Sequence, residues 1–260
     1  MRRIAFVNEK GGTCKTTLAV HTAAWLATKR GARVLLCDTD TQGHAGKSLG
    51  IDVRELDVSM AEFLHDPEVA LSEALLPSPL PGLDVLPSNK RMADFVMGVA
   101  SDPDRDRRLQ RRLADLAGYD YVIFDAPPSM GLVTNNVMLA AEEIVVPVAM
   151  TYFALDGCAE ILATVDSIRA RFDHRRLHVS MVVPVLYRKT ALADEILEKL
   201  RERFPEEICR TVLGYSVQID EAQSHGSTVW EHAPNSKGAA ALEAIAMELA
   251  TRGAGLRRAV

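Results

Sequence analysis

The sequence predicts an α/β fold with a mostly parallel, twisted sheet and helices on both of its faces. Short β-branched runs alternate with helical segments along the chain, which is the pattern of parallel strands joined by crossover helices. The chain has 260 residues, of which 48% are hydrophobic, and this is enough to bury the core of one large α/β domain. We therefore expect residues 1–260 to form a single domain.

Six of the short β-branched runs that alternate with helical segments are the candidates for buried strands. Leu75–Gly82 is rich in proline, but a strand pattern follows it at once, so we expect a surface loop there and not a domain boundary. The strand candidates are Ile4–Val7, Val34–Asp38, Leu83–Leu86, Tyr121–Asp125, Ile144–Val148 and Val179–Val183.

Two stretches show the periodicity of helices that pack on such a sheet. Thr16–Arg30 reads as a helix that ends at Gly31, because glycine readily takes the left-handed conformation of a helix C-terminus. Asp194–Phe204 reads as a second helix, with four apolar side chains on one face. These four residues are Ile196, Leu197, Leu200 and Phe204.

Composition and charge argue against several classes of protein. The formal net charge of −5 means that any contact with nucleic acid requires a local basic patch. The N-terminus lacks the pattern of a signal peptide, and no apolar run approaches the ~18 residues of a membrane helix. The four cysteines form no CxxC pair, which argues against a zinc site or a disulfide framework and favours a reducing cytoplasm. They are Cys14, Cys37, Cys158 and Cys209.

The stretch "VNEKGGTCKTT", Val7 to Thr17, is similar to a phosphate-binding loop. In the pattern G-x-x-x-x-G-K-[ST], backbone N–H groups surround phosphates, the lysine neutralises them and the hydroxyl binds Mg²⁺. Glu9 and Cys14 occupy the two glycine positions here, so the strict pattern is absent. A strand, this loop and a helix nevertheless follow in the right order, which aims a helix N-terminus at an anion. On the loop alone, a Gly-Gly turn before a Thr-capped helix remains the alternative.

Carboxylates follow two of the predicted strands. "VLLCDTDTQG" ends its strand with Asp38 and Asp40, and "YDYVIFDAPPSMG" ends another with Asp125. Ligands of open α/β sheets bind at this edge, and an acidic residue placed there can hold Mg²⁺ through water. Each acid alone could be a helix cap or a surface residue. Together with the loop they predict a nucleotide and magnesium site.

Four stretches resemble a known family, the ParA/Soj-type partition ATPases of the wider ParA/MinD group, whose deviant Walker A loop has the form K-G-G-x-x-K-[ST]. They occur in the family's order from residue 4 to about residue 250. The resemblance implies a Rossmann-like P-loop fold. The four stretches are "KGGTCKTT", "DTDTQG", "DAPPSMGLVTNN" continuing into "IVVPVAMTYFALDG", and "DEAQSHGSTVWEHAPNSKGAAAL".

The resemblance also implies roles for individual residues. Lys10 crosses the interface of an ATP-bound dimer and touches the partner's nucleotide, so it acts in trans like an arginine finger. Lys15 binds the β- and γ-phosphates, and Asp40 positions the attacking water. Thr16, Asp38 and Asp125 belong to the Mg²⁺ shell, and Thr17 contacts the α-phosphate. The nucleotide-binding residues are then Lys10, Gly11, Gly12, Thr13, Cys14, Lys15, Thr16 and Thr17. The alternative for Lys10 is a solvated loop lysine.

Two positions depart from the family pattern. Cys14 replaces a glycine, and its added Cβ is expected to crowd the loop or restrict its backbone, with altered kinetics more than lost binding. Thr41 stands where proline is usual, which leaves that switch segment looser. A reactive thiol at Cys14 is the alternative role, because a helix N-terminus lowers a thiol pKa.

Binding of nonspecific DNA is expected from the family, but Tyr215 and Gln218 stand where relatives often have arginine. Basic residues that remain as DNA-binding candidates include Arg188, Lys189, Arg169 and Arg171, followed by Arg175 and Arg176. The alternative is a solvated basic face with nearby acids. Arg108 and Arg112, one helical turn apart, are expected on a solvated helix face and not at DNA.

Attachment to a membrane, the habit of the MinD branch, is not expected. The C-terminal region is rich in alanine, and Leu242, Ile245 and Leu249 have the spacing of a helix packed on the core. A membrane-surface helix instead shows bulky apolar residues opposite a lysine-rich stripe.

The expected function is therefore that of an ATP- and Mg²⁺-dependent partition or positioning ATPase. It forms a homodimer when ATP-bound, binds nonspecific DNA in the cytoplasm at the nucleoid, and has its hydrolysis stimulated by a ParB-like or other adaptor protein. Two alternatives stay open, a nucleotide-gated binding module with hydrolysis nearly lost and a metabolic P-loop enzyme. The sequence leaves the cargo and the effect of Cys14 on hydrolysis undetermined.

Overall fold

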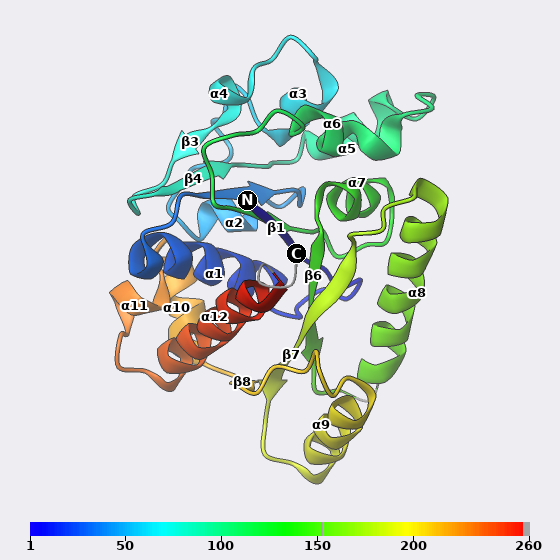
Figure 1. Cartoon of the computed structure of the whole chain (residues 1–260). Helices are drawn as coiled ribbons and strands as arrows, with labels where there is room; N and C mark the ends of the chain where they lie inside the picture. The colour runs from blue at the N-terminus through cyan, green and yellow to red at the C-terminus, as the bar shows by residue number, and fades with distance from the viewer. Residues whose placement is uncertain (152, 257–260) are drawn as a thin grey trace.

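An eight-stranded sheet forms the centre of the computed structural model, which describes residues 1–151 and 153–256 (Figure 1). The strand order is β3-β4-β2-β5-β1-β6-β7-β8, and all neighbours are parallel except β3 and β4. The predicted mostly parallel sheet is confirmed. The strands are β1 (Arg2–Phe6), β2 (Val34–Asp38), β3 (Leu76–Pro77), β4 (Leu83–Leu86), β5 (Tyr121–Asp125), β6 (Glu143–Ala149), β7 (His178–Tyr187) and β8 (Leu213–Gly214).

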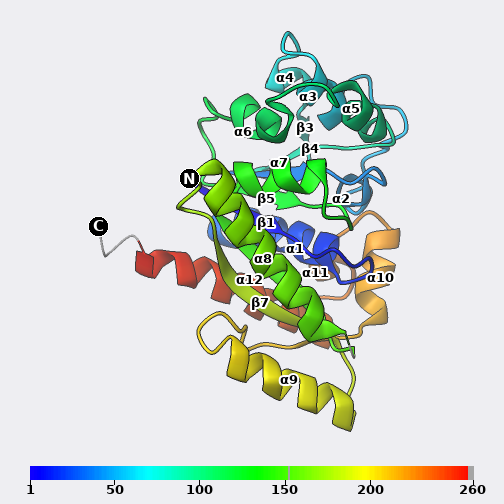
Figure 2. The same cartoon turned by 90° about the vertical axis from the view of Figure 1, so that its right-hand side faces the viewer.

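Helices cover both faces of this sheet, as predicted (Figures 1 and 2). Along β1 the side chains alternate: Ile4 and Phe6 join the core under α1, α10 and α12, while Ala5 joins the core under α7 and α8. The helices are α1 (Lys15–Arg30), α2 (His44–Lys47), α3 (Met60–His65), α4 (Leu71–Ala74), α5 (Met92–Gly98), the 3₁₀ turn η1 (Arg105–Arg107), α6 (Arg108–Arg112), α7 (Leu132–Ala140), α8 (Ala154–Phe172), α9 (Ala191–Arg203), α10 (Val217–Ser224), α11 (Val229–His232) and α12 (Lys237–Leu256).

All six predicted strands are present, as β1, β2, β4, β5, β6 and β7. The two strands that were not predicted, β3 and β8, have two residues each, which is too short for an alternating pattern. β3 lies inside the Leu75–Gly82 stretch that was expected to be a loop. Pro77 is tolerated there because β3 is the edge strand of the sheet.

The predicted helices and their apolar faces are confirmed, although α9 begins at Ala191, three residues before the predicted start at Asp194. α1 ends at Gly31, whose φ is 63° and whose N–H donates to the Leu26 carbonyl. The apolar residues predicted on one face of α9 are buried, as are Leu242, Ile245 and Leu249 of α12. Within residues 1–151 and 153–256, no helix is both long enough and apolar enough to cross a bilayer.

Arg108 and Arg112, which were expected on a solvated helix face, are both partly buried. Arg108 forms an ion pair with Asp102 at 2.7 Å. Arg112 lies 4.3 Å from the centre of the Phe63 ring and donates to the Phe63 carbonyl at 2.8 Å. The planar guanidinium stacks on the ring and satisfies main-chain acceptors, so Arg112 joins α6 to the end of α3.

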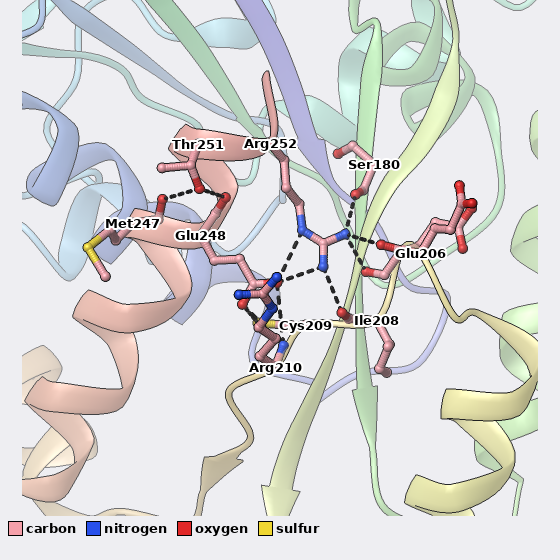
Figure 3. Close-up of polar contacts among 10 residues, drawn as sticks. Ser180, Glu206, Ile208, Cys209, Arg210, Met247, Glu248, Thr251 and Arg252 are labelled. Atoms are coloured by element: carbon pink, nitrogen blue, oxygen red, sulfur yellow. Dashed lines mark hydrogen bonds and ion pairs between the residues drawn. The ribbon is translucent and has the colours of Figure 1, made fainter. Parts of the chain in front are cut away.

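Arg252, near the end of α12, connects this helix to β7 and to the segment before β8 (Figure 3). Its guanidinium donates to the carbonyls of Ser180 at 3.2 Å and Ile208 at 2.7 Å, and it pairs with Glu248 at 2.6 Å. Further donation to the carbonyls of Glu206 and Glu207 joins α12 to the segment between α9 and β8. Because the main-chain acceptors belong to β7 and to the segment that leads to β8, one side chain ties α12 to this end of the sheet.

Candidate functional site

The central strands β2, β5 and β1 end at the same edge of the sheet, and the segments that follow them face one cavity. Its volume is about 720 Å³. The carboxyl ends of adjacent parallel strands are the usual ligand site of an open α/β sheet. The lining residues are Gly11, Gly12, Thr13, Cys14, Lys15, Thr16, Thr17, Asp40, Gln42, His44, Lys47, Ser48, Pro128, Gln223 and Ser224.

The loop from Lys10 to Thr17 connects β1 to α1 and forms one wall of the cavity. It passes through two left-handed residues, Gly12 with φ 70° and Cys14 with φ 60°, and Cys14 is the N-cap of α1. The Thr13 hydroxyl donates to the Lys10 carbonyl at 3.2 Å. This shape directs backbone N–H groups and a helix N-terminus at the cavity, which favours the binding of phosphate.

Cys14 adopts a backbone conformation that suits glycine. A left-handed φ brings a Cβ close to the following carbonyl, so any L residue is strained there. Burial raises the pKa of the Cys14 thiol to about 11, Asp220 acts in the same direction and Lys15 opposes it. The thiol is therefore protonated at neutral pH, which argues against the alternative of a reactive thiolate.

Lys15 folds back over the loop, and its Nζ donates to the Lys10 carbonyl at 3.0 Å. The side chain is buried, and burial lowers the pKa of Lys15, while the carboxylates of Asp125 and Asp40 act in the opposite direction. An ammonium group at the base of the loop, facing two acids, is placed to offset phosphate charge in the cavity.

Asp38 and Asp125 are opposite each other at the ends of β2 and β5, and both are 0% exposed. Asp38 accepts N–H bonds from Asp40 (3.0 Å), Ala45 (2.9 Å) and Gly46 (3.4 Å), so it anchors the segment that carries Asp40. Burial raises the pKa of Asp38 to about 7 against these hydrogen bonds. Sequence reasoning assigned Asp38 to a metal shell, whereas its contacts here are with the main chain.

Asp125 differs from Asp38, because neither of its carboxylate oxygens has a hydrogen-bond partner. Burial and the charge of Asp38 raise the pKa of Asp125 well above its ordinary value, while the side chains of Thr16 and Lys15 act in the opposite direction. A buried carboxylate without a partner is costly unless a cation neutralises it. Carboxylate and hydroxyl oxygens are the ligands that Mg²⁺ prefers, so Asp125 and Thr16 fit a magnesium ion.

Asp40 lies at the rim of the same cavity, half-buried. Its Oδ1 accepts the backbone N–H of Gln42 at 3.1 Å and the hydroxyl of Thr41 at 3.3 Å. These bonds engage one oxygen of the carboxylate in the turn that leads to α2. Asp40 is therefore held at the cavity by local contacts and by the anchor at Asp38.

Lys10, like the fully buried Asp38 and Asp125, is a predicted site residue that does not line the cavity. Its Nζ donates to the Phe153 carbonyl at 2.7 Å and lies 5.5 Å from the centre of the Phe153 ring. Phe153 is the N-cap of α8. In the single chain, Lys10 thus points toward the start of α8 and away from the residues that its own loop presents to the cavity.

The structure separates the basic residues that were candidates for binding DNA. Arg188 and Lys189 are exposed after β7, and Arg188 lies 5.2 Å from the centre of the Tyr215 ring after the neighbouring strand β8. Arg169 and Arg171 lie in the last turn of α8, at the opposite edge of the sheet, because a crossover helix between parallel strands runs from one edge to the other. The latter two pair with Asp166 at 3.5 Å and Asp106 at 3.6 Å. One protomer therefore carries no single patch of all four.

Sequence reasoning missed the wall of the cavity formed by α2 and α10, including Gln223 and Ser48. Gln223 belongs to one of the four stretches that resemble the family, but the stretch gave it no role, and no motif marks Ser48. Both residues reach the cavity through the packing of segments that are distant in sequence. Two glycines allow the close packing of these segments: a Cβ on Gly226 would lie 2.7 Å from the Gly50 Cα. Both glycines also have a positive φ.

Comparison with known proteins gives a consistent result along the chain. A family model described as an AAA domain matches residues 1–179. The chromosome-partitioning ATPase Soj of Thermus thermophilus is 38% identical over 252 residues, which are 97% of this chain and 96% of that protein. The sporulation initiation inhibitor protein Soj of Bacillus subtilis is 33% identical over 251 residues, with 96% and 98% covered. The structure of cobyrinic acid a,c-diamide synthase from Mycobacterium smegmatis, with bound ADP and magnesium, is 30% identical with a TM-score of 0.84, covering 98% of this chain and 96% of that chain.

A first prediction concerns the strain at Cys14. Cys14→Gly and Cys14→Ala both remove the sulfur, but only alanine keeps a Cβ at φ 60°. The glycine variant should be more stable than the alanine variant by roughly 0.5–1 kcal/mol, after the larger unfolded-state entropy of glycine is subtracted from the left-handed strain. Urea denaturation measures the difference, and an alanine variant of equal or greater stability would contradict the strain.

A second prediction concerns Asp125 and pH. Its pKa is raised in the folded chain, so its protonated form contributes stability at low pH that is lost as the pH rises toward that pKa. Asparagine does not ionise, so the stability of Asp125→Asn relative to the wild type should increase from pH 5 to pH 8 by more than about 1 kcal/mol. Denaturant titrations in magnesium-free buffer measure this, with the exposed Asp57→Asn as control. A difference that does not change with pH is the opposite outcome.

Proposed function

This chain belongs to the ParA/Soj-type family of partition ATPases, and from that premise we propose that it positions DNA or another cargo through an ATP-gated dimer. It hydrolyses ATP, and Mg²⁺ is the cofactor. The observation that best supports this use of the site is the buried, unpartnered carboxylate of Asp125 beside Thr16 and Lys15, beneath a loop that presents N–H groups.

Each side chain of the site has a separate task in this proposal. Lys15 and the N–H groups from Gly11 to Thr17 hold the phosphates, and Asp125 with Thr16 holds Mg²⁺, whose charge stabilises the leaving phosphate oxygens when it is bound. Asp40 accepts a hydrogen bond from the attacking water and orients it. Asp38 positions Asp40 through its bonds to the main chain of the same segment.

Lys10 links this chemistry to assembly. Its ammonium is held in cis by the Phe153 carbonyl, so reaching a second protomer requires that contact to break. In the ATP-bound dimer Lys10 approaches the nucleotide of the partner, where it offsets phosphate charge. The single chain then has an incomplete site, and dimer formation becomes a condition for hydrolysis.

DNA is the surface on which this dimer acts. The support comes from exposed Arg188 and Lys189 at the same edge of the sheet as the cavity, next to Tyr215. Dimer formation doubles this small patch, and phosphate contacts are independent of sequence. The dimer therefore occupies the nucleoid in the cytoplasm until a ParB-like or other adaptor protein stimulates hydrolysis.

A metabolic enzyme is the second candidate, because a synthase is 30% identical across nearly the whole chain. Such an enzyme would turn over ATP rapidly with a small acceptor and would need neither DNA nor a protein activator. The variants below separate the two candidates.

Asp40→Ala and Lys10→Ala test two different steps: Asp40→Ala tests hydrolysis, and Lys10→Ala tests ATP-dependent dimerisation. If water orientation supplies ~3 kcal/mol of transition-state stabilisation, Asp40→Ala should slow single-turnover hydrolysis by roughly a hundredfold while ATP-bound dimers accumulate. Lys10→Ala should bind ATP as a monomer but fail to dimerise. Analytical ultracentrifugation and quench-flow measure both, with Lys15→Ala as the variant that loses ATP binding.

Normal turnover in Asp40→Ala, or a complete dimer in Lys10→Ala, contradicts the role assigned to that residue. The metabolic candidate is favoured by a different outcome. In that case the wild-type chain does not dimerise with a nonhydrolysable ATP analogue, and it turns over ATP rapidly with a small acceptor.

Charge reversal tests the DNA surface with a control built into the fold. Arg188→Glu with Lys189→Glu should greatly weaken ATP-dependent binding to random duplex and reduce its dependence on salt. Arg169→Glu with Arg171→Glu makes the same change of charge at the opposite edge and should weaken it much less. Fluorescence anisotropy at several salt concentrations measures both, and equal effects would exclude the proposed patch.

A further inference from the structure

The side chain of Gln223 in α10 links the first turn of α1 to the residue that follows α2. Its Oε1 accepts the hydroxyl of Thr17, in the first turn of α1, at 3.3 Å. Its Nε2 donates to the hydroxyl of Ser48, directly after α2, at 3.2 Å. Ser48 is buried and donates in turn to the His44 carbonyl at 2.8 Å. One amide thus connects the nucleotide loop to the segment that follows Asp40.

These three hydrogen bonds form a series in which each donor points the same way, from Thr17 through Gln223 and Ser48 to the His44 carbonyl. If the amide turned over, Nε2 would donate to Thr17 and Oε1 would accept from Ser48. A hydroxyl has one proton, so Ser48 would then release the His44 carbonyl. The position of the Thr17 proton therefore determines which of two arrangements the chain adopts.

We propose that Gln223 is a positioning residue that transmits the contact between Thr17 and the nucleotide to α2 and the Asp40 segment. This inference rests on the proposed function and on the contact of Thr17 with the α-phosphate that the family resemblance implies, with the Thr17 hydroxyl as the donor. Once that proton is used, Gln223 Oε1 has no donor at Thr17, and turning over restores two hydrogen bonds to the amide. The His44 carbonyl then keeps only its main-chain bond from Ser48 N–H, at 2.9 Å.

The contacts around α2 limit the structural change that follows nucleotide binding to the segment from Asp40 to Ser48. Gly50 and Gly226 are in direct contact, so the loops after α2 and α10 cannot move closer together. At the other end of α2, Gly43 donates to the Asp40 carbonyl at 3.1 Å, and Lys47 donates to the Gly43 carbonyl at 3.1 Å. A change at His44 is therefore passed through Gly43 to Asp40, the residue proposed to orient the water.

Three variants test the relay. Gln223→Met keeps the length of the side chain without its hydrogen bonds, Ser48→Ala removes the second link, and the third combines both. Gln218→Met, an exposed position on the same helix, is the matched control. ATP affinity is measured by calorimetry, turnover by quench-flow, and mobility of residues 44–48 by hydrogen exchange with and without ATP.

Each single variant should retain ATP affinity within about twofold, whereas kcat should fall about fivefold, the size of one lost hydrogen bond of ~1 kcal/mol. The double variant should be no slower than either single variant, because each single substitution already breaks the same series of hydrogen bonds. The ATP-dependent change in exchange at residues 44–48 should disappear in all three variants and persist in Gln218→Met.

Additive losses, or an ATP response at residues 44–48 that survives in Gln223→Met and Ser48→Ala, would overturn the relay while leaving the ATPase assignment intact. A wild-type chain that fails to bind ATP would instead overturn the proposed use of the loop, and the relay with it. The two failures are thus distinguishable.

Discussion

A buried carboxyl group without a hydrogen-bond partner in the protein is the constraint on which the rest of the site depends. Asp125 ends the central strand β5 with both oxygens unpaired, and Asp38 ends the neighbouring strand in the same layer. Two carboxylates this deep destabilise the folded chain unless a cation joins them. The remaining features reduce that cost only partly: main-chain N–H groups approach Asp38, and the Lys15 ammonium faces Asp125. A cation bound beside these two carboxylates would therefore offset the cost of burying them and stabilise the folded chain.

The parts of the fold that were predictable from sequence are those determined by local patterns. β-branched runs located six strands, and the glycine after Arg30 located the end of α1, because these signals act within a few residues. The loop and the three acids were also found, since strand ends in a parallel sheet share one edge. Cys14 was identified from its place in a glycine pattern, and the left-handed φ gives the physical reason.

The features that sequence reasoning missed depend on contacts between distant segments. Gln223 and Ser48 are 175 positions apart and meet only because two glycine loops touch. Arg112 appeared to be a solvated residue until its ring partner, Phe63, was in place. The four basic residues that were candidates for DNA binding are close in sequence, yet the crossover helix α8 carries two of them to the far edge. Sequence distance and spatial distance diverge most where a helix reverses the direction of the chain.

The contact that holds Lys10 has a consequence for how such chains vary. Its acceptor is the main-chain carbonyl of Phe153 and not a carboxylate. A carboxylate could be lost through a single nucleotide change, whereas every amino acid carries a carbonyl. The aromatic ring beside it can therefore drift among homologues without removing the resting position of the lysine. Selection acting on this contact would be visible in the backbone geometry at the start of α8 and would leave little trace in an alignment.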